Sequence, residues 1–308
     1  MDGLAIIDKP AGMSSHDVVA RARRITRMRA IGHAGTLDPM ATGVLTLCIG
    51  QATRLSEYLL GEEKGYVARV RLGARSNTDD AEGEIVEGSA PDFSPAALRA
   101  ALAALTGPLQ QIPPQFSAIQ RDGQRAYALA RKGETVDLPA RPVTVYELTW
   151  LDEAGLIDAA GDWNAGAAPL EIGLRARVSA GTYIRALARD LGEALGCGGL
   201  LSALRRTQAG PFGIASATTL EAWQAMGPDW GQILRPMDEA VVGFPRVDAD
   251  SETARRVNLG QFPTAPAGLP EGLARVYDPQ GRLIAIARIA DGKIHPAKVF
   301  AGAPPAAG

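Results

Sequence analysis

The side chain best placed for chemistry is the carboxylate of Asp38, in a run of fourteen residues from Gly32 to Leu45. The run holds three glycines, one of the chain's three histidines and an Asp-Pro pair. Proline pushes the residue before it out of the α region, and glycines let a ligand approach the backbone closely. Asp38 is therefore predicted on a constrained loop, followed by a buried strand over 44–49. A carboxylate held in this way can act as a nucleophile, although ordinary turn residues would give the same pattern.

A helix over 15–28 is predicted immediately before this loop. Ser14 and Asp17 have the spacing of a capping box, and apolar residues recur at helical intervals after them. The opposite face carries five arginines within nine residues and no acidic residue: Arg21, Arg23, Arg24, Arg27 and Arg29. A solvated helix face normally mixes the two signs of charge. Contact with phosphates therefore stands beside the plainer interpretation of an exposed face.

Composition sets the limits for the rest of the chain. A length of 308 residues favours two domains, and 46% hydrophobic with 21% charged residues is typical of a soluble globular protein. The net charge of −2 predicts no general attraction to nucleic acid, so RNA binding would need a local patch. We expect no membrane span and no signal peptide. Cys48 and Cys197 look like buried residues in a reducing compartment, which indicates a cytoplasmic protein.

The run Gly32-His33-x-Gly35-Thr36-Leu37-Asp38-Pro39-x-Ala41-x-Gly43-x-Leu45 resembles the catalytic motif of the bacterial tRNA pseudouridine synthase B family. That family isomerises uridine 55 in the T loop of tRNA. Further blocks resemble the family in the same order: Lys9-Pro10-x-Gly12-x-Ser14-Ser15, Tyr66 with 71–73 and 78–83, Pro113-Pro114-x-Phe116-Ser117-Ala118, Gly181-Thr182-Tyr183-Ile184-Arg185, and Leu204-Arg205-Arg206. The resemblance covers residues 4 to about 300.

The resemblance implies a role for each matching residue. Asp38 is the expected nucleophile, Arg185 its partner, and Asp80 a supporting acid. Lys9 and Pro10 are expected to brace the loop. The target base is expected to contact Tyr66, Tyr183 and Leu204, while His33 fills the space that the flipped base leaves. RNA backbone contacts are expected from Arg21, Arg24, Arg27, Arg205 and Arg206. The reaction conserves atoms and oxidation state, so no metal or cofactor is expected. The expected partner is tRNA, bound by a monomer.

The expected fold class is α+β. A mixed, largely antiparallel central sheet flanked by helices, the pseudouridine synthase fold, is predicted for 1–238. Short strands at 273–277, 283–289 and 298–300 predict a small β-barrel-like module over 239–303, which the resemblance identifies as a PUA-like RNA-binding domain. Helices are predicted to begin at Ser94 and, with Thr182 as N-cap, near 183; a short one is expected at 126–131, after a strand at 116–120. A Gly/Ala/Asp-rich insertion at 153–169 has no assigned function, and 304–308 is expected to be disordered.

Three other functions compete with this one. A guide-RNA-dependent pseudouridine synthase shares the motifs, but the short chain lacks basic tails. An RNA-binding or tRNA-folding protein could carry the loop as a vestige, although the motif is complete. A glycosidase could use Asp79 and Asp80 as paired carboxylates, but neighbouring residues of a strand or loop tend to point apart.

Overall fold

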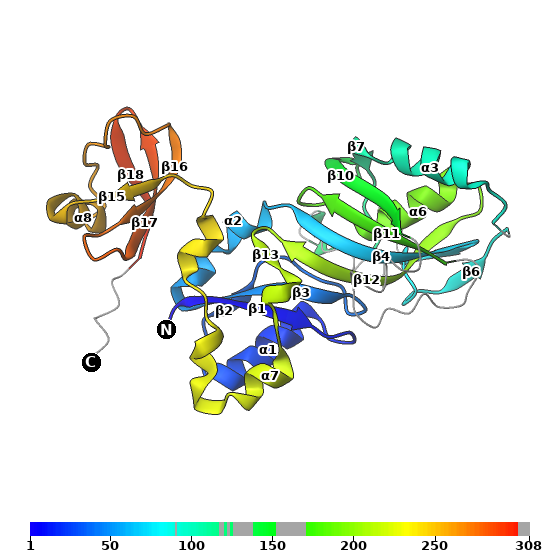
Figure 1. Ribbon diagram of the computed structural model, residues 1–308, viewed down its shortest axis with the longest axis horizontal. Coiled ribbons are helices and arrows are strands. Elements are labelled where there is room, and N and C mark those ends of the chain that lie inside the picture. Colours follow the sequence, from blue (N-terminus) through cyan, green and yellow to red (C-terminus); the bar gives the residue numbers. More distant parts are fainter. Residues whose placement is uncertain (90, 117–119, 122–123, 126–137, 152–170, 301–308) are drawn as a thin grey trace.

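The computed structural model describes residues 1–89, 91–116, 120–121, 124–125, 138–151 and 171–300 (Figure 1). Four sequence predictions lie wholly or mostly outside these residues: the end of the strand at 116–120, the helix at 126–131, the insertion at 153–169 and the tail at 304–308.

A large mixed sheet forms the body of the protein. Its strands follow the order β14-β1-β3-β12-β4-β11-β10-β7, with β2 paired to β3 and β13 paired to β12. Most neighbours are antiparallel, while β12 with β3 and β1 with β14 are parallel. The expected mixed, largely antiparallel sheet is confirmed. Its strands are β1 (Gly3–Lys9), β2 (Ile31–His33), β3 (Thr42–Ile49), β4 (Lys64–Leu72), β7 (Gly107–Gln111), β10 (Arg141–Leu151), β11 (Glu171–Val178), β12 (Gly199–Ala209), β13 (Phe212–Gly213) and β14 (Thr218–Thr219).

Helices flank this sheet and bury its apolar residues. Helix α6 packs on β12 and β4, α3 packs on β10, and α1 lies beside α7 (Figure 1). Two short hairpins add β5 (Ala74–Ser76) with β6 (Ile85–Glu87) and β8 (Gln120–Arg121) with β9 (Gln124–Arg125). The helices are α1 (Ser15–Thr26), α2 (Ser56–Leu60), α3 (Pro95–Ala104), α6 (Ile184–Ala194) and α7 (Leu220–Ala225), with 3-10 turns at Gly50–Leu55, Ile214–Ser216, Gly227–Ile233 and Met237–Val241.

Two helix ends can be compared directly with the sequence predictions. The capping box of Ser14 and Asp17 begins α1 as expected, but the helix ends at Thr26 because Arg27 adopts a left-handed φ of 58°. The prediction of Thr182 as N-cap of α6 was wrong. The N-cap is Tyr183, and it makes no side-chain cap hydrogen bond.

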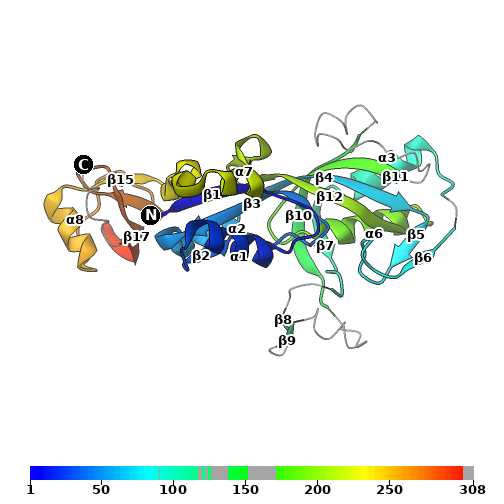
Figure 2. The same cartoon turned by 90° about the horizontal axis from the view of Figure 1, so that it is seen from below.

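The C-terminal strands form a separate four-stranded sheet at the opposite end of the molecule from β7 and α3 (Figures 1 and 2). Its order is β15 (Arg246–Asp248), β16 (Gly272–Tyr277), β17 (Leu283–Ala290) and β18 (Lys293–Val299), with α8 (Ser251–Asn258) packed on β17 and β18. The expected C-terminal module of short strands is confirmed. Its Ile286 and Phe300 share an apolar cluster with Leu55 and Leu59 of the larger body, so buried contacts join the two parts.

Within the described ranges, none of the helices is both long and apolar enough to span a membrane.

Candidate active site

A cavity of about 280 Å³ opens where β4 and β12 face the Asp38 loop and the start of α6. Alternate residues of one strand share a face of a sheet, and so β4 supplies Lys64 and Tyr66 while β12 supplies Leu204 and Arg206. Tyr66 and Arg206 are direct partners across these two strands. The facing wall contains Asp38 with Gly35, Thr36 and Leu37, the residues Gly181–Arg185, and Phe116.

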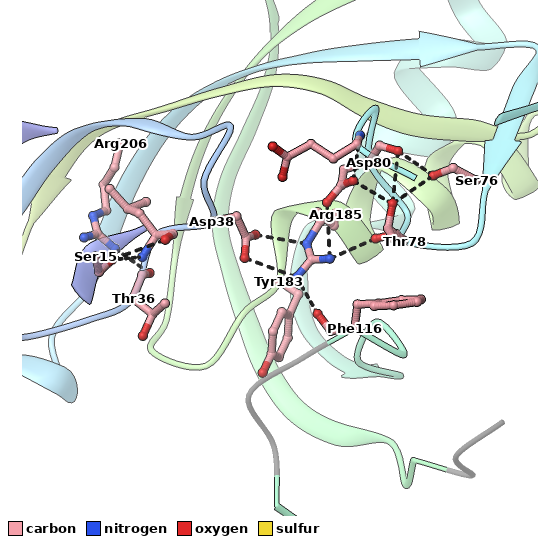
Figure 3. A network of polar contacts seen from close by, with 12 residues as sticks. Ser15, Thr36, Asp38, Ser76, Thr78, Asp80, Phe116, Tyr183, Arg185 and Arg206 are labelled. Atoms are coloured by element: carbon pink, nitrogen blue, oxygen red, sulfur yellow. Dashed lines mark hydrogen bonds and ion pairs between the residues drawn. The ribbon is translucent and has the colours of Figure 1, made fainter. Parts of the chain in front are cut away.

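Asp38 and Arg185 meet in this cavity (Figure 3). Oδ2 of Asp38 lies 3.0 Å from Nε of Arg185, and Nη2 of Arg185 donates a hydrogen bond of 3.4 Å to Oδ1. The two side chains differ in exposure: 36% for Asp38 and 6% for Arg185. The arginine is thus built into the protein, while the carboxylate remains open to a molecule in the cavity.

Nη1 and Nη2 of Arg185 make further contacts. Nη1 donates to the carbonyl of Thr78 at 2.9 Å and lies 3.3 Å from Oδ2 of Asp80, while Nη2 donates to the carbonyl of Phe116 at 2.9 Å. Asp80 is buried and is itself fixed, because its Oδ1 accepts from the Thr78 hydroxyl at 2.6 Å and from the Glu82 amide at 3.0 Å. A guanidinium held by this many acceptors has a single orientation.

Asp79 and Asp80 face different arginines of α6. Asp79 adopts a left-handed φ of 59°, and its carboxylate pairs with Arg189 at 2.9 Å, while Asp80 pairs with Arg185. The two carboxylates are therefore both engaged by arginines one helical turn apart. They do not flank a common space, which argues against the paired-carboxylate glycosidase.

Three side chains hold the backbone on either side of Asp38. Arg206 donates to the carbonyls of Gly35 at 3.2 Å, Thr36 at 3.3 Å and Val44 at 2.7 Å. Ser15 both donates to the Leu37 carbonyl and accepts from the Leu37 amide, at 3.2 and 2.9 Å.

Lys9 holds the other side of the loop. Its Nζ donates to the carbonyls of Pro39 at 3.2 Å, Met13 at 2.5 Å and Pro10 at 2.8 Å. Lys9 is completely buried and Pro10 is half-buried beside it. The backbone carbonyls around Asp38 are thus paired before any substrate enters, which fixes the direction of the carboxylate.

The expectation that Arg206 contacts RNA backbone was wrong. Arg206 is 1% exposed, and its guanidinium donates hydrogen bonds to three carbonyls of the loop region. Arg205 points to the opposite face of β12, as alternation along a strand requires. There it pairs with Asp8 at 2.8 Å and donates to the Thr42 hydroxyl at 3.3 Å.

The surroundings alter the pKa values of two of these groups. Burial raises the pKa of Asp38 above its usual 3.8, the nearby Arg185 and Lys9 oppose the rise, and the like charge of Asp80 adds to it. Burial lowers the pKa of Lys9 to about 8, although Asp38 opposes that change. The fixed positive charges of Arg185 and Lys9 therefore offset part of the desolvation cost of the ionised Asp38 carboxylate.

The other residues singled out from the sequence lie around the cavity or outside it. Tyr66, Tyr183 and Leu204 line it. His33 does not belong to its lining; it lies at the end of β2 with its ring edge against His16, the centroids 5.2 Å apart, and burial lowers its pKa.

The arginines of the first helix lie on the surface near α7. Arg24 and Arg27 are exposed, whereas Arg21 is half-buried and lies 3.4 Å from Glu221. Arg21 and Arg24 border a hollow together with Met13, Ile25 and Gln224. Two of the three expected phosphate contacts are therefore fully accessible.

Four residues of the site were not singled out from the sequence: Ser15, Lys64, Gln111 and Phe116. Ser15 and Phe116 fell within matching motifs but carried no assigned role. Lys64 is buried in the cavity wall, where its Nζ donates to the carbonyls of Leu60 at 2.7 Å and Glu62 at 2.5 Å. A polar residue at the start of a strand gives no signal of such a role unless its tertiary partners are known.

No group of three or more His, Cys, Asp or Glu side chains with the arrangement of a metal site occurs among the residues that the structure describes.

Comparison with known proteins gives consistent matches along the chain. Residues 23–184 match the TruB family pseudouridylate synthase N-terminal domain, 185–242 the tRNA pseudouridylate synthase B C-terminal domain, and 245–300 the pseudouridine synthase II TruB C-terminal domain. The tRNA pseudouridine synthase B of Arthrobacter sp. (strain FB24) is 46% identical over 98% of this chain and 97% of its own. That of Thermobifida fusca (strain YX) is 47% identical over 98% and 99%.

A solved structure gives the same answer for the fold. An H/ACA RNP bound to a substrate RNA containing 2′-deoxyuridine contains a chain that is 25% identical, with a TM-score of 0.71 over 97% of this chain and 85% of that one. Together with the matches along the sequence and the Asp38–Arg185 cavity, this shows that the chain belongs to the TruB family of pseudouridine synthases.

Proposed function

We propose that this enzyme isomerises uridine 55 in the T loop of tRNA, with Asp38 as the nucleophile. Its family membership makes it an isomerase that converts uridine to pseudouridine in tRNA. The observation that carries the proposed role of Asp38 is the geometry of its carboxylate, which opens into the cavity while Arg185 holds it from behind.

The reaction needs a nucleophile and a rotating base. The N1–C1′ bond of uridine breaks, the base turns, and a C5–C1′ bond forms; C5 loses its proton and N1 gains one. No oxidant or reductant enters this balance. A carboxylate can form and release a covalent adduct with the base or the sugar. Arg185 and Lys9 favour the ionised state of Asp38 that such an attack requires, against the effect of burial.

The cavity is suited to a flipped nucleotide. A base inside folded tRNA must leave its stack before a carboxylate inside a cavity can reach it. We assign Tyr66, Tyr183 and Leu204 as walls for this base, because they surround the space in front of Asp38. Lys64, Arg185 and Arg206 give that lining more cationic than anionic side chains, so its net charge is positive.

RNA outside the cavity has two proposed contact regions. We assign Arg24 on α1 and Arg27 just after its end to the phosphate backbone because both are exposed, with the half-buried Arg21 beside them. His33 lies outside the cavity, against His16, and its proposed role is to occupy the place that the base leaves in the RNA stack. Arg205 completes the proposed backbone contacts, although Asp8 already neutralises part of its charge.

The proposed domains are 1–238 for catalysis, 239–303 for PUA-like RNA binding, and 304–308 as a tail. The four-stranded sheet and its helix α8 fall inside the second range. We propose that the protein is a cytoplasmic monomer. We also propose that it uses neither metal nor cofactor, because the isomerisation conserves atoms and oxidation state. Two buried free cysteines, Cys48 and Cys197, fit a reducing compartment.

Of the competing functions, the guide-RNA-dependent synthase has one observation in its favour, the fold shared with the H/ACA RNP. The relatives named tRNA pseudouridine synthase B are much closer in sequence, at 46–47% identity against 25%, and match this chain nearly end to end. We therefore propose that the enzyme recognises tRNA without a guide.

Release of tritium from tRNA labelled at C5 of uridine tests the role of Asp38. The new C5–C1′ bond displaces that hydrogen into water. We expect release by the wild type and none by Asp38→Asn, with tRNA affinity changed by no more than a few-fold. Turnover by Asp38→Asn would remove Asp38 from the nucleophile role. Transcripts with U55 replaced by cytidine test the position, since release should disappear with them.

A further inference from the structure

The amide of Gln111 forms a reciprocal pair of hydrogen bonds with the backbone of Tyr183. The Tyr183 N–H donates to Oε1 of Gln111 at 2.8 Å, and Nε2 of Gln111 donates to the Tyr183 carbonyl at 3.1 Å. The two residues are 72 positions apart, and Gln111 is the last residue of β7 at the edge of the large sheet. This pairing joins a rigid strand to a residue of the cavity wall.

The pairing fixes the backbone where α6 begins, beside the helical hydrogen bond that the Leu187 N–H donates to the Tyr183 carbonyl. Tyr183 lies between the end of β11 and the first residue of α6, just after Gly181, whose φ is +81°. As N-cap of α6 it has no side-chain cap hydrogen bond. Gln111 thus fixes, from a distant strand, the backbone of the residue that precedes the first turn of α6.

Gln111 is an unusual residue to find buried. It is 3% exposed, and an unpaired buried amide is costly. Both Oε1 and Nε2 of its amide group bond to Tyr183, and these two hydrogen bonds set the orientation of the amide. The following segment is fixed to α6 at two more points, since Arg189 donates to the Ile112 carbonyl and Arg185 to the Phe116 carbonyl, each at 2.9 Å.

We propose that Gln111 is a positioning residue that sets the place of the Tyr183 ring against the target base. This inference rests on the proposed role of Tyr183 as a wall of the cavity. Gln111 does not line the cavity and does not act on substrate itself. A small shift of the Tyr183 backbone moves the ring against the base, so losing the amide pair lowers the rate of the chemical step more than it lowers the affinity for tRNA.

The test compares Gln111→Met with Gln110→Met. Methionine has a similar length but lacks both hydrogen-bonding groups, and Gln110 is the exposed neighbour on the same strand. Single-turnover tritium release, tRNA affinity by filter binding, and Tm are measured for each. We expect Gln111→Met to lower the single-turnover rate constant about tenfold with affinity within about twofold, and Gln110→Met to match the wild type. Gln111→Glu keeps the acceptor for the Tyr183 N–H and should show a smaller loss; it also serves if Gln111→Met does not fold.

A double-mutant cycle separates positioning from general support of the fold. In a Tyr183→Ala background there is no ring to position, so Gln111→Met should then lower the rate constant by less than about twofold. An undiminished loss in that background would overturn the proposal. So would an unchanged rate constant in the single variant, or a loss of affinity as large as the loss of rate. Failure of the nucleophile assignment is read separately, from turnover by Asp38→Asn.

Discussion

The backbone of Arg206 lies directly against Gly43. A Cβ atom on Gly43 would be 2.2 Å from the Arg206 carbonyl oxygen, and the φ of Gly43 is +98°. The two residues are register partners in the parallel pair of β12 and β3. The end of the Asp38 loop and the strand that carries Arg206 therefore approach at a distance that only glycine allows.

Gly43→Ala should destabilise the protein strongly, because it combines a left-handed backbone with a clash against backbone atoms. We expect a loss of at least about 2 kcal/mol in the free energy of unfolding, measured by urea denaturation. Gly32→Ala is the matched control from β2 in the same motif, since nothing lies within 4 Å of its added Cβ. Its effect should stay within about 0.5 kcal/mol. Equal stabilities for the two variants would contradict this account of the loop.

Arg206→Lys distinguishes a loop support from an RNA contact, because lysine keeps the positive charge. Arg206 reaches the carbonyls of Gly35, Thr36 and Val44 with three different nitrogens, which the single Nζ of a lysine at this position cannot replace. We expect kcat to fall about tenfold or more, while tRNA affinity and its dependence on salt remain those of the wild type. Tritium release measures kcat, and filter binding over a salt series measures the tRNA affinity and its dependence on salt.

Arg24→Gln serves as the opposite control for Arg206→Lys. Arg24 is exposed on α1, so losing its charge should weaken tRNA binding and reduce the slope of log K against log salt by about 1. Turnover at saturating tRNA should be preserved. If Arg206→Lys instead reduced the salt slope while keeping kcat, Arg206 would be the phosphate contact after all.

Arg185→Lys should abolish most turnover while leaving tRNA bound. Lysine is a point charge and cannot bridge Asp38, Asp80 and two carbonyls at once. We expect the single-turnover rate constant to fall about 100-fold or more. Arg189→Lys is the matched control, because Arg189 also pairs with a carboxylate of the same motif but does not touch Asp38. A rate constant for Arg185→Lys close to that of Arg189→Lys would show that the contact with Asp38 is unimportant.

Asp38→Asn should make the inactive protein more stable at neutral pH. The folded state raises the pKa of Asp38 above 3.8, so ionisation of this group is less favourable in the folded than in the unfolded chain. The stabilisation associated with this group is present at low pH and is lost as pH rises through the folded-state pKa. We expect the Tm of Asp38→Asn to exceed that of the wild type at pH 7, with the difference shrinking toward pH 4. A lower Tm at pH 7 would mean that the pair with Arg185 outweighs burial.

The sequence predicted the residues that line the cavity better than the residues that hold them in place. Asp38, Tyr66, Tyr183, Leu204 and Arg185 were all singled out, and the structure brings them around one cavity. Asp38, Tyr183 and Arg185 lie in short motifs whose glycines or prolines restrict the local backbone. The resemblance to a family then related motifs that lie far apart in the chain, which local patterns alone could not do.

The supports were missed or misread because their partners are distant. Two adjacent arginines resemble an RNA contact, yet β12 turns Arg205 and Arg206 to opposite faces and buries the second. Predicting a strand over 199–209 would have indicated this alternation. Gln111 gave no signal at all, because a glutamine in an extended segment is usually solvated. Thr182 has the residue type of an N-cap, but the turn at Gly181 places Tyr183 in that position.

The position of β12 has a consequence for how the protein is made. It lies between β3 and β4 in the sheet, although it follows both in the chain by more than a hundred residues. During synthesis, the parts of β3 and β4 that pair with β12 must therefore stay unpaired until residues 199–209 leave the ribosome. The same strand brings Leu204 to the cavity and Arg206 to the loop. A nascent chain that stops before β12 lacks the strand that joins β3 to β4 and the Arg206 hydrogen bonds to the Asp38 loop, so insertion of this strand closes the sheet and supplies the last of the described loop supports in one step.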